Sequence, residues 1–288
     1  MSGAAESGPI GIVASRVRLD EKRIMAAFDR RAVKYDYVDS RTCWYELDGT
    51  APRWPVALNR EIGQVRAAAA ARGLEANGVE VLNGSAAIEL CGDKWRTSVA
   101  LRDAGLPVPR TALALTPESA LEAIERMGYP AVIKPLTGSW GRLVTALHDR
   151  HAATAVLEHV AALPSPQSHI VYVQEMVPTP ERDIRVIVVG GEVIGATYRR
   201  GDQWRTNVAL GATTEVCPLT PELEHLARSA ALAVGADIAG VDLLEEPDGR
   251  LLVLEVNSGV EFSGFQAAMG DHVDVAGRIA DHVLTRMV

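Results

Sequence analysis

Short apolar runs alternate with helical stretches along the chain, and this alternation restricts it to folds that mix strands and helices. Residues 10–14 (IGIVA) are such a run and predict a buried strand. A stretch with Ile24 and Phe28 at helical spacing follows, and residues 33–38 alternate like a second strand. This order, with short links, predicts a small, open α/β domain over residues 1–88.

The rest of the chain continues the alternation and predicts two further domains, over 89–172 and 173–288. Hairpins are indicated where the pairs Gly-Gly at 190–191 and Asp-Gly at 248–249 join apolar runs, and Thr116 is a candidate N-cap. The predicted helices cover residues 61–75, 93–104, 117–127, 221–234 and 273–286. The predicted strands cover residues 79–82, 129–134, 171–177, 183–189, 192–198, 238–244 and 250–256. We therefore expect the α/β (α+β) fold class.

Composition narrows the class of protein. The chain has 288 residues, 48% of them hydrophobic, which is enough to bury more than one core. A net charge of −8 without a long basic run argues against nucleic acid or an anionic membrane as a partner. Cys43, Cys91 and Cys217 form no CxxC pair and indicate reduced thiols. The N-terminus lacks a signal-peptide pattern, and no apolar run approaches the ~18–20 residues that span a bilayer. We expect a soluble, cytoplasmic protein.

Several familiar site motifs are absent from the sequence. Neither GxGxxG after the first predicted strand nor the Walker pattern GxxxxGK[ST] occurs. The seven histidines show no HExxH spacing, and no Ser-His-Asp or Cys-His arrangement with a recognisable elbow is present. A nucleotide would therefore be bound in another way, and nucleophilic hydrolysis and zinc chemistry fit poorly.

Acidic side chains lie inside the two apolar runs of the last predicted hairpin. Asp242 lies in GVDLLE, and Glu255 and Asn257 lie in LEVN. The last two point to the same face of one strand, and Asp242 lies on the partner strand. A solvated polar face is the alternative, but such apolar surroundings are not typical of one, and a buried carboxylate needs a partner. Three converging oxygen donors predict a Mg²⁺ site completed by substrate phosphates.

Two lysines are candidates for phosphate binding. Lys134 ends an apolar strand and precedes Pro135, and Lys94 opens a predicted helix. Lysine is a compact positive charge that commonly binds phosphate, although either residue, taken alone, is more typical of a surface lysine. Lys134 differs because it lies at a strand end next to a loop that contains glycine.

That loop, TGSWGR, resembles a flexible phosphate lid. Gly138 and Gly141 let backbone N–H groups face an anion, Ser139 can donate a hydrogen bond, and Arg142 adds positive charge. Trp140 would either cover a ligand or pack against the protein. Because two glycines near a serine occur in many turns, the pattern does not by itself distinguish a lid from a turn.

Two other segments allow a functional and a structural interpretation. The strand VQEMV at 173–177 would pair its outer backbone with an adenine edge, or would only connect two domains. Arg199, Arg200, Arg205 and Asn207 lie in YRRGDQWRTN after the first hairpin. These side chains would clamp phosphates or carboxylates, or would form a basic loop in an otherwise acidic chain.

Taken in order, these residues resemble a known family. The set Lys94, Lys134-Pro135, TGSWGR, VQEMV, DIRVIVVGGEV, WRTN, GVDLLE and EVN covers nearly the whole chain and resembles the RimK/LysX group of ATP-grasp ligases. CGDKWRTS, KPLTGSWGRL and EFSGF are most similar to LysX and ArgX, the amino-group carrier protein ligases of lysine and arginine biosynthesis. The resemblance implies a three-domain ATP-grasp fold with ATP between the central and C-terminal domains.

The resemblance also implies a role for each candidate residue. The residues implied to contact the phosphates of ATP are Lys94, Lys134, Gly138, Ser139, Trp140, Gly141, Arg142, Arg199, Arg205 and Asn207. Those implied to bind the nucleoside are Glu175 at the adenine amino group, the Met176 main chain beside it, and Asp183 at the ribose. Asp242, Glu255 and Asn257 are implied to bind two Mg²⁺ ions, with Mn²⁺ as an alternative. Lys134 and Arg205 are implied to be catalytic.

In this family a carboxylate attacks the γ-phosphorus of ATP, and an amine then displaces phosphate from the acyl phosphate. The resemblance implies that the carboxylate is the side chain of the C-terminal Glu of a small acidic carrier protein. The amine is then the α-amino group of glutamate or α-aminoadipate. The implied substrate residues are Arg205, Val208, Ala209, Ser258, Gly259, Val260, Glu261, Phe262, Gly264 and Phe265. A homo-oligomer, either a dimer or a tetramer, is also implied.

The segment after Asn257 distinguishes the two amino acids in this family. LysX-type enzymes carry N-[TS] there, and ArgX-type enzymes carry Gly-Phe. The pair Gly264-Phe265 favours glutamate, whereas Ser258-Gly259 matches neither pattern. Two alternatives remain. One is a ligase of the same class with another acceptor, such as a RimK-like protein C-terminal glutamylase or a small dipeptide ligase. The other is a non-catalytic nucleotide-binding protein, although no metal ligand or phosphate lysine is missing.

Overall fold

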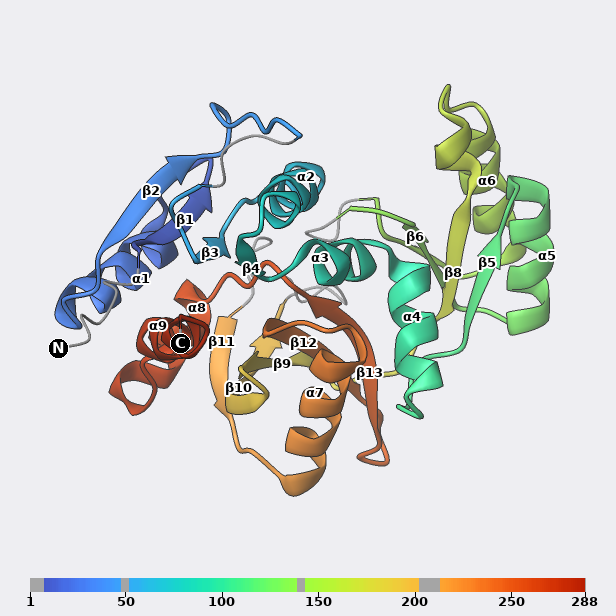
Figure 1. Ribbon diagram of the computed structural model, residues 1–288. Helices are drawn as coiled ribbons and strands as arrows, with labels where there is room; N and C mark the ends of the chain where they lie inside the picture. The colour runs from blue at the N-terminus through green and yellow to red at the C-terminus, as the bar shows by residue number, and fades with distance from the viewer. Residues whose placement is uncertain (1–7, 48–51, 139–142, 202–212, 288) are drawn as a thin grey trace, which may run out of the picture.

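The computed structural model describes residues 8–47, 52–138, 143–201 and 213–287. In that part of the chain it contains three β-sheets with helices around them (Figure 1). The N-terminal and middle sheets lie at opposite ends of the view in Figure 1, with the C-terminal sheet between them and below. This mixture of helices and sheets confirms the predicted α/β (α+β) class. None of the described helices combines the length and the apolar character needed to cross a membrane.

The N-terminal sheet is open and parallel, with the strand order β2-β1-β3-β4. Its strands are β1 (Ile10–Ala14), β2 (Tyr35–Asp39), β3 (Val56–Asn59) and β4 (Glu80–Leu82), and its helices are α1 (Leu19–Arg30) and α2 (Gln64–Ala76). The helix predicted from residue 61 begins three residues later, because the Glu61 carboxylate accepts a hydrogen bond from the Gly63 N–H in the preceding loop. Parallel strands end at one edge of a sheet, so the loops after β1 and β3 lie together.

The middle sheet is antiparallel, with the order β5-β8-β6-β7. Its strands are β5 (Thr111–Ala114), β6 (Ala131–Pro135), β7 (Thr145–Leu147) and β8 (Val171–Glu175). Helices α3 (Ser85–Gly92) and α4 (Lys94–Asp103) precede it, and α5 (Pro117–Met127), α6 (Arg150–Ala161) and the 3₁₀ turn η1 (Pro166–His169) belong to it. Thr116 caps α5 as predicted, by accepting a hydrogen bond from the Ser119 N–H. Strand β8 spans the predicted boundary between the second and third domains, at residues 172 and 173. The domain boundaries stay a prediction.

The C-terminal sheet is antiparallel, with the order β11-β10-β9-β12-β13. Its strands are β9 (Arg182–Val189), β10 (Glu192–Arg200), β11 (Thr213–Cys217), β12 (Ile238–Glu245) and β13 (Leu251–Asn257). Its helices are α7 (Pro221–Ala233), α8 (Ser263–Met269), the 3₁₀ turn η3 (Gly270–His272) and α9 (Val275–Thr285). Both predicted hairpins are confirmed, the first with Gly190 and Gly191 at φ angles of 59° and 78°, which favour glycine.

The two faces of the C-terminal sheet are covered differently. One face packs against α7 and against side chains of α3 and α4, such as Ala87 and Leu101. The other face packs against α8, α9 and the N-terminal unit, so that Ile12 and Phe28 share one core with Ile187. In Figure 1, α8 and α9 lie beside the N-terminal sheet. This shared core fixes the edge of the N-terminal sheet next to the hairpin that carries the predicted metal ligands.

Candidate active site

The predicted metal ligands converge on the β12–β13 hairpin. In the register of these strands Asp242 lies opposite Glu255, and Gly240 lies opposite Asn257. The Asn257 Nδ2 atom lies 3.2 Å from Glu255 Oε1 and 3.3 Å from Asp242 Oδ2. Asp242 is only 2% exposed. The alternation of side chains along the two strands therefore brings three oxygen-bearing groups together, as the sequence predicted.

Two arginines hold Asp242 from the neighbouring strands. Arg185 on β9 lies opposite Asp242 and donates hydrogen bonds to both of its carboxylate oxygens. Arg199 on β10 contacts Asp242 Oδ1 at 3.1 Å and forms a bidentate pair with Asp183 at 2.6 Å. Burial raises the pKa of Asp242, but these two positive charges outweigh burial and lower that pKa below its usual value.

Arg185 was not among the predicted site residues. It lies two residues after Asp183 on β9, so that both side chains point to the same face of the strand. That spacing was visible in the sequence DIRVIVV, but the partner of Arg185 on β12 was not. For Arg199, the structure shows ion pairs with the two aspartates, and a role at the phosphates stays a prediction. The same holds for Asp183 at the ribose.

The two predicted phosphate lysines lie near the same hairpin. Lys134 lies at the end of β6 and donates a 2.6 Å hydrogen bond from Nζ to Gln174 Oε1. Burial lowers the pKa of Lys134 to about 8, against the opposing effect of the Glu255 charge. Lys94 begins α4, and its Nζ donates to the Gly138 carbonyl at 2.9 Å. Burial lowers the pKa of Lys94 as well, again opposed by Glu255. Glu255 thus lies within electrostatic range of both lysines.

The predicted adenine-binding residues lie at the end of β8. Glu175 Oε1 accepts a hydrogen bond from the Arg110 backbone N–H at 2.7 Å, and the Met176 N–H donates to the Pro130 carbonyl at 3.3 Å. Both groups therefore have partners within the middle unit, and their contact with adenine stays a prediction. The other predicted residues lie outside the described part of the chain: Ser139, Trp140, Gly141, Arg142, Arg205, Asn207, Val208 and Ala209.

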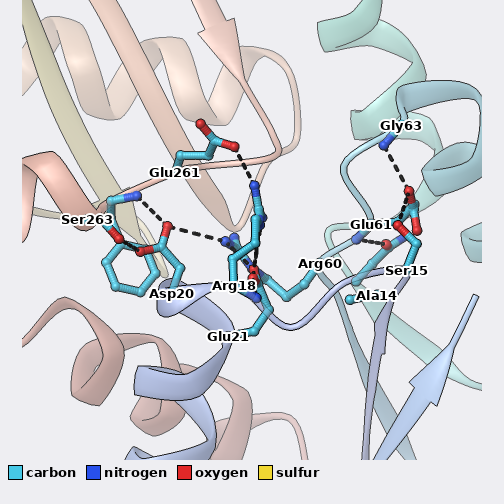
Figure 2. A network of polar contacts seen from close by, with 12 residues as sticks. Ala14, Ser15, Arg18, Asp20, Glu21, Arg60, Glu61, Gly63, Glu261 and Ser263 are labelled. Atoms are coloured by element: carbon cyan, nitrogen blue, oxygen red, sulfur yellow. Dashed lines mark hydrogen bonds and ion pairs between the residues drawn. The ribbon is translucent and has the colours of Figure 1, made fainter. Parts of the chain in front are cut away.

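A cavity of about 480 Å³ joins the hairpin to the N-terminal unit. Its lining includes Arg18 and Arg60 from the loops after β1 and β3, and Arg199, Glu255 and Asn257 from the C-terminal sheet. Arg18 and Arg60 were not predicted, because they belong to loops whose meeting depends on the order of strands in the sheet. Figure 2 shows these arginines within a network of polar contacts.

The predicted substrate segment divides into two groups. The residues of this segment that line the cavity are Ser258, Gly259, Glu261, Gly264 and Phe265. Val260 and Phe262 are instead fully buried and pack in the core shared with the N-terminal unit. Their apolar side chains pack in that core instead of lining the cavity. Contact of the residues of this segment with a substrate stays a prediction.

Comparison with known proteins identifies the family. The LysX preATP-grasp domain matches residues 10–90, and the RimK-like ATP-grasp domain matches residues 91–283. The chain belongs to the RimK-like ATP-grasp family. The resemblance inferred from the sequence is thereby confirmed, and this ATP-grasp protein is an enzyme of the ligase class, in a family that uses ATP.

Relatives of this ATP-grasp ligase match over most of its length. The glutamate–LysW ligase ArgX of Sulfolobus acidocaldarius is 32% identical over 95% of this chain and 97% of its own. The α-aminoadipate–LysW ligase LysX of Sulfurisphaera tokodaii is 29% identical over 88% of this chain and 90% of its own. The crystal structure of the RimK domain protein ATP-grasp from Sphaerobacter thermophilus has a TM-score of 0.81 and 28% identity, and covers 96% of this chain and 99% of that chain.

The donor set of this ATP-grasp ligase fits a hard divalent cation. Asp242, Glu255 and Asn257 offer carboxylate and amide oxygens, which Mg²⁺ prefers. No group of three or more His, Cys, Asp or Glu side chains is arranged to hold a metal ion in the residues that the structure describes. An amide oxygen as the third ligand is consistent with that result. Arg185 donates to both oxygens of Asp242, which leaves each oxygen a further lone pair for a cation, whereas Asn257 faces the two carboxylates with Nδ2 and would have to turn its amide to present the oxygen.

Proposed function

We propose that this enzyme joins the α-amino group of an amino acid, glutamate before α-aminoadipate, to the side-chain carboxylate of a C-terminal Glu on a small acidic carrier protein. One observation carries the proposal. A single cavity is lined by Glu255 and Asn257 of the predicted metal site, by two arginines of the C-terminal sheet and by most residues of the segment 258–265. Phosphoryl transfer and amide formation need these groups side by side, since one cavity must hold the nucleotide end, the carboxylate and the amine.

Positive side chains near the β12–β13 hairpin support the first step. The carrier carboxylate attacks the γ-phosphorus, ADP leaves, and an acyl phosphate remains. Lys134 and Lys94 neutralise the transferring phosphoryl group, and Arg199 adds charge nearby. Asp242, Glu255 and Asn257 would hold two Mg²⁺ ions, or Mn²⁺ in their place, which stabilise negative charge on the phosphate oxygens when bound.

The segment 258–265 supports the choice of amino acid. The amine attacks the carbonyl carbon of the acyl phosphate, phosphate leaves, and the amine loses a proton as the amide forms. Gly264 and Phe265, which line the cavity, match the Gly-Phe pattern expected for glutamate. The name of the Sulfolobus acidocaldarius relative contains glutamate and LysW, and its match covers nearly the whole chain. We extend the amino acid, glutamate, and the kind of partner, a carrier protein, to this enzyme.

The same proposal covers the partners and the compartment. A carrier protein with a C-terminal Glu would present a flexible acidic end to a cavity lined by Arg18, Arg60 and Arg199. The protein itself carries a net charge of −8, so that attraction must come from these local arginines rather than from the whole surface. We further propose a cytoplasmic enzyme that forms a dimer or a tetramer.

Intact mass of the carrier tests the proposal directly. The enzyme is incubated with ATP, Mg²⁺, a small carrier protein that ends in Glu, and either glutamate or α-aminoadipate, while phosphate release is followed in parallel. We expect the carrier to gain one glutamate and the phosphate to match it. A carrier that ends in Gln is the matched control and should gain nothing.

The other outcomes separate the alternatives. Gain of α-aminoadipate alone would keep the ligase class and overturn the choice of amino acid. No gain with either amino acid, together with phosphate release on another acceptor, would indicate a protein C-terminal glutamylase or a dipeptide ligase. Nucleotide binding without phosphate release on any acceptor would indicate a non-catalytic protein.

A further inference from the structure

Side chains of the N-terminal unit hold the segment after Asn257 at three points. Asn83, which follows β4, donates from Nδ2 to the carbonyls of Ser258 and Ile238, both at 2.7 Å. Asp20, at the start of α1, accepts hydrogen bonds from the Phe262 N–H at 2.8 Å and from the Ser263 hydroxyl. Arg18 forms an ion pair with Glu261. Figure 2 shows the Asp20 and Arg18 contacts reaching across to this segment.

Buried groups in turn fix the side chain of Arg18. Glu21 is fully buried, and it accepts hydrogen bonds from Arg18 Nε at 3.0 Å and Arg18 Nη2 at 2.9 Å. The same carboxylate accepts from Arg60 Nε at 3.1 Å, and the Arg60 side chain is only 3% exposed. A bidentate pair restricts the rotamers of an arginine. Arg18 therefore presents its remaining nitrogen, Nη1, to Glu261 in a defined direction.

These contacts set which side chains of the segment face the cavity. Glu261 lines the cavity, whereas Val260 and Phe262 on either side of it are fully buried. A shift of residues 260–262 by one position would bring an apolar side chain to the cavity and bury Glu261. Asp20 binds the Phe262 N–H and the next hydroxyl, which opposes such a shift.

We propose that Asp20 and Arg18 are positioning residues that set which amino acid the enzyme attaches. They hold Glu261, Phe262 and Ser263 so that the cavity wall has one fixed shape, and an amino acid is selected against that wall. The inference rests on the proposed function, since it concerns the acceptor of the same site. Selectivity would then depend on two residues that touch the wall in space but lie more than two hundred positions from it in the sequence.

The variants Asp20→Asn and Asp281→Asn form a matched pair. Asp281 on α9 accepts hydrogen bonds from Arg31, the residue that follows α1, at 2.7 and 2.9 Å. This pair also joins the N-terminal unit to the C-terminal part of the chain, but it does not line the cavity. Asp20→Asn keeps the shape of the side chain and removes one acceptor oxygen. Asp281→Asn makes the same chemical change at the control contact.

The first readout is the ratio of kcat/KM for glutamate and α-aminoadipate, with the KM for ATP measured alongside. Loss of a charged hydrogen-bond acceptor at a buried contact predicts a change of about tenfold in that ratio for Asp20→Asn. The KM for ATP should stay within about twofold, since the loss of one charge has little effect on binding at a site that it does not contact. Asp281→Asn should leave both unchanged. An equal change in both variants, or none in Asp20→Asn, would overturn the inference.

Hydrogen exchange supplies a second readout that does not depend on activity. The Phe262 amide donates to Asp20, so that peptides covering residues 258–265 should exchange faster in Asp20→Asn and in Arg18→Gln than in the wild type. Unchanged exchange in both variants would contradict positioning. A wild-type enzyme that attaches no amino acid to any carrier would overturn the proposed function and this inference with it. Wild-type ligation with unaltered selectivity in the variants would overturn the inference alone.

Discussion

Two buried carboxylates in this enzyme are each held by two guanidinium groups. Asp242 is held by Arg185 and Arg199, and Glu21 is held by Arg18 and Arg60. The local chemistry is the same, but the neighbours differ. Asp242 lies beside two further oxygen-bearing groups, whereas the Glu21 carboxylate also accepts the Arg18 backbone N–H.

This difference separates a carboxylate with further oxygen-bearing groups beside it from one that is bonded by guanidinium groups and a backbone N–H. Replacing an arginine by a cation at Asp242 preserves the charge balance, because Glu255 and Asn257 supply more oxygens. Around Glu21, loss of either guanidinium leaves the buried carboxylate with one positive partner instead of two. A pair of arginine and carboxylate therefore indicates a metal site where further oxygen ligands lie beside it.

The largest expected effect is on activity at the first carboxylate. Asp242→Asn should lower the rate of ligation by about a thousandfold, because a neutral amide binds Mg²⁺ less well and leaves phosphoryl charge less stabilised. The measurement is carrier intact mass against time. Glu245→Gln is the matched control, since Glu245 lies on the same strand and pairs with Arg182 at 2.7 Å away from the oxygen cluster. An Asp242→Asn rate near that of Glu245→Gln would contradict the assignment.

The second effect is on stability at the other carboxylate. Glu21→Gln should lower the free energy of unfolding by about 3 kcal/mol, because the buried Arg60 loses its 3.0 Å ion pair and keeps only the longer 3.9 Å contact with Asp20. Urea unfolding measures this change. The control is Glu89→Gln, whose partner Arg72 lies at the surface and whose loss should cost less than about 1 kcal/mol. Equal destabilisation by the two variants would show that the Glu21 contacts act like a surface ion pair.

A third experiment compares how the two sites respond to metal. Mg²⁺ with a non-hydrolysable ATP analogue at about one hundred times its dissociation constant should stabilise the wild type by about 2.7 kcal/mol. The Glu21→Gln variant should gain as much stability, because the substituted residue is not one of the metal ligands. Asp242→Asn should gain less. The shift in melting temperature measures all three, and a full gain in Asp242→Asn would exclude that residue as a ligand.

The smallest expected effect is a difference in pH dependence. Burial lowers the pKa of Lys134 to about 8, so this side chain loses its positive charge as the pH rises through that value. The value of kcat/KM for ATP, which reports groups of the free enzyme, should fall about tenfold from about pH 7 to about pH 9. Lys134→Arg should remove this decline. Selectivity between amino acids should not follow it, since burial acts to lower the pKa of Arg18 but its hydrogen bond and charge contact with Glu21 raise that pKa overall, and Arg18 stays charged over this range.

Local patterns predicted what lies within one or two neighbouring strands. Alternation and the Asp-Gly turn placed Asp242, Glu255 and Asn257 together, and Thr116 marked the start of α5. The strand β3 and the helix α3 were not predicted, because a run of four apolar residues and an eight-residue helix give little periodic signal. The sequence thus predicted whether an element is a helix or a strand better than it predicted how many elements there are.

Contacts between distant segments could not be predicted from the sequence. The hydrogen bond from the Phe262 N–H to Asp20 joins residues 242 positions apart, and it depends on the shared core that brings α1 to α8. The pair of Arg185 and Asp242 likewise depends on β9 and β12 being neighbours. Neither residue type nor spacing shows such neighbours, because the order of strands is decided by the whole sheet.

The separation of the hydrophobic cores has a consequence for cooperativity. Ile12, Phe28 and Ile187 lie in one core, so the N-terminal and C-terminal sheets should lose their structure together. The middle sheet has its own core, built among β5–β8, α5 and α6, and the cluster that contains Leu101 binds α4 to the C-terminal sheet instead. The middle sheet should therefore unfold as a separate cooperative unit, while Val260 and Phe262, which pack in the core shared by the other two sheets, stay in place.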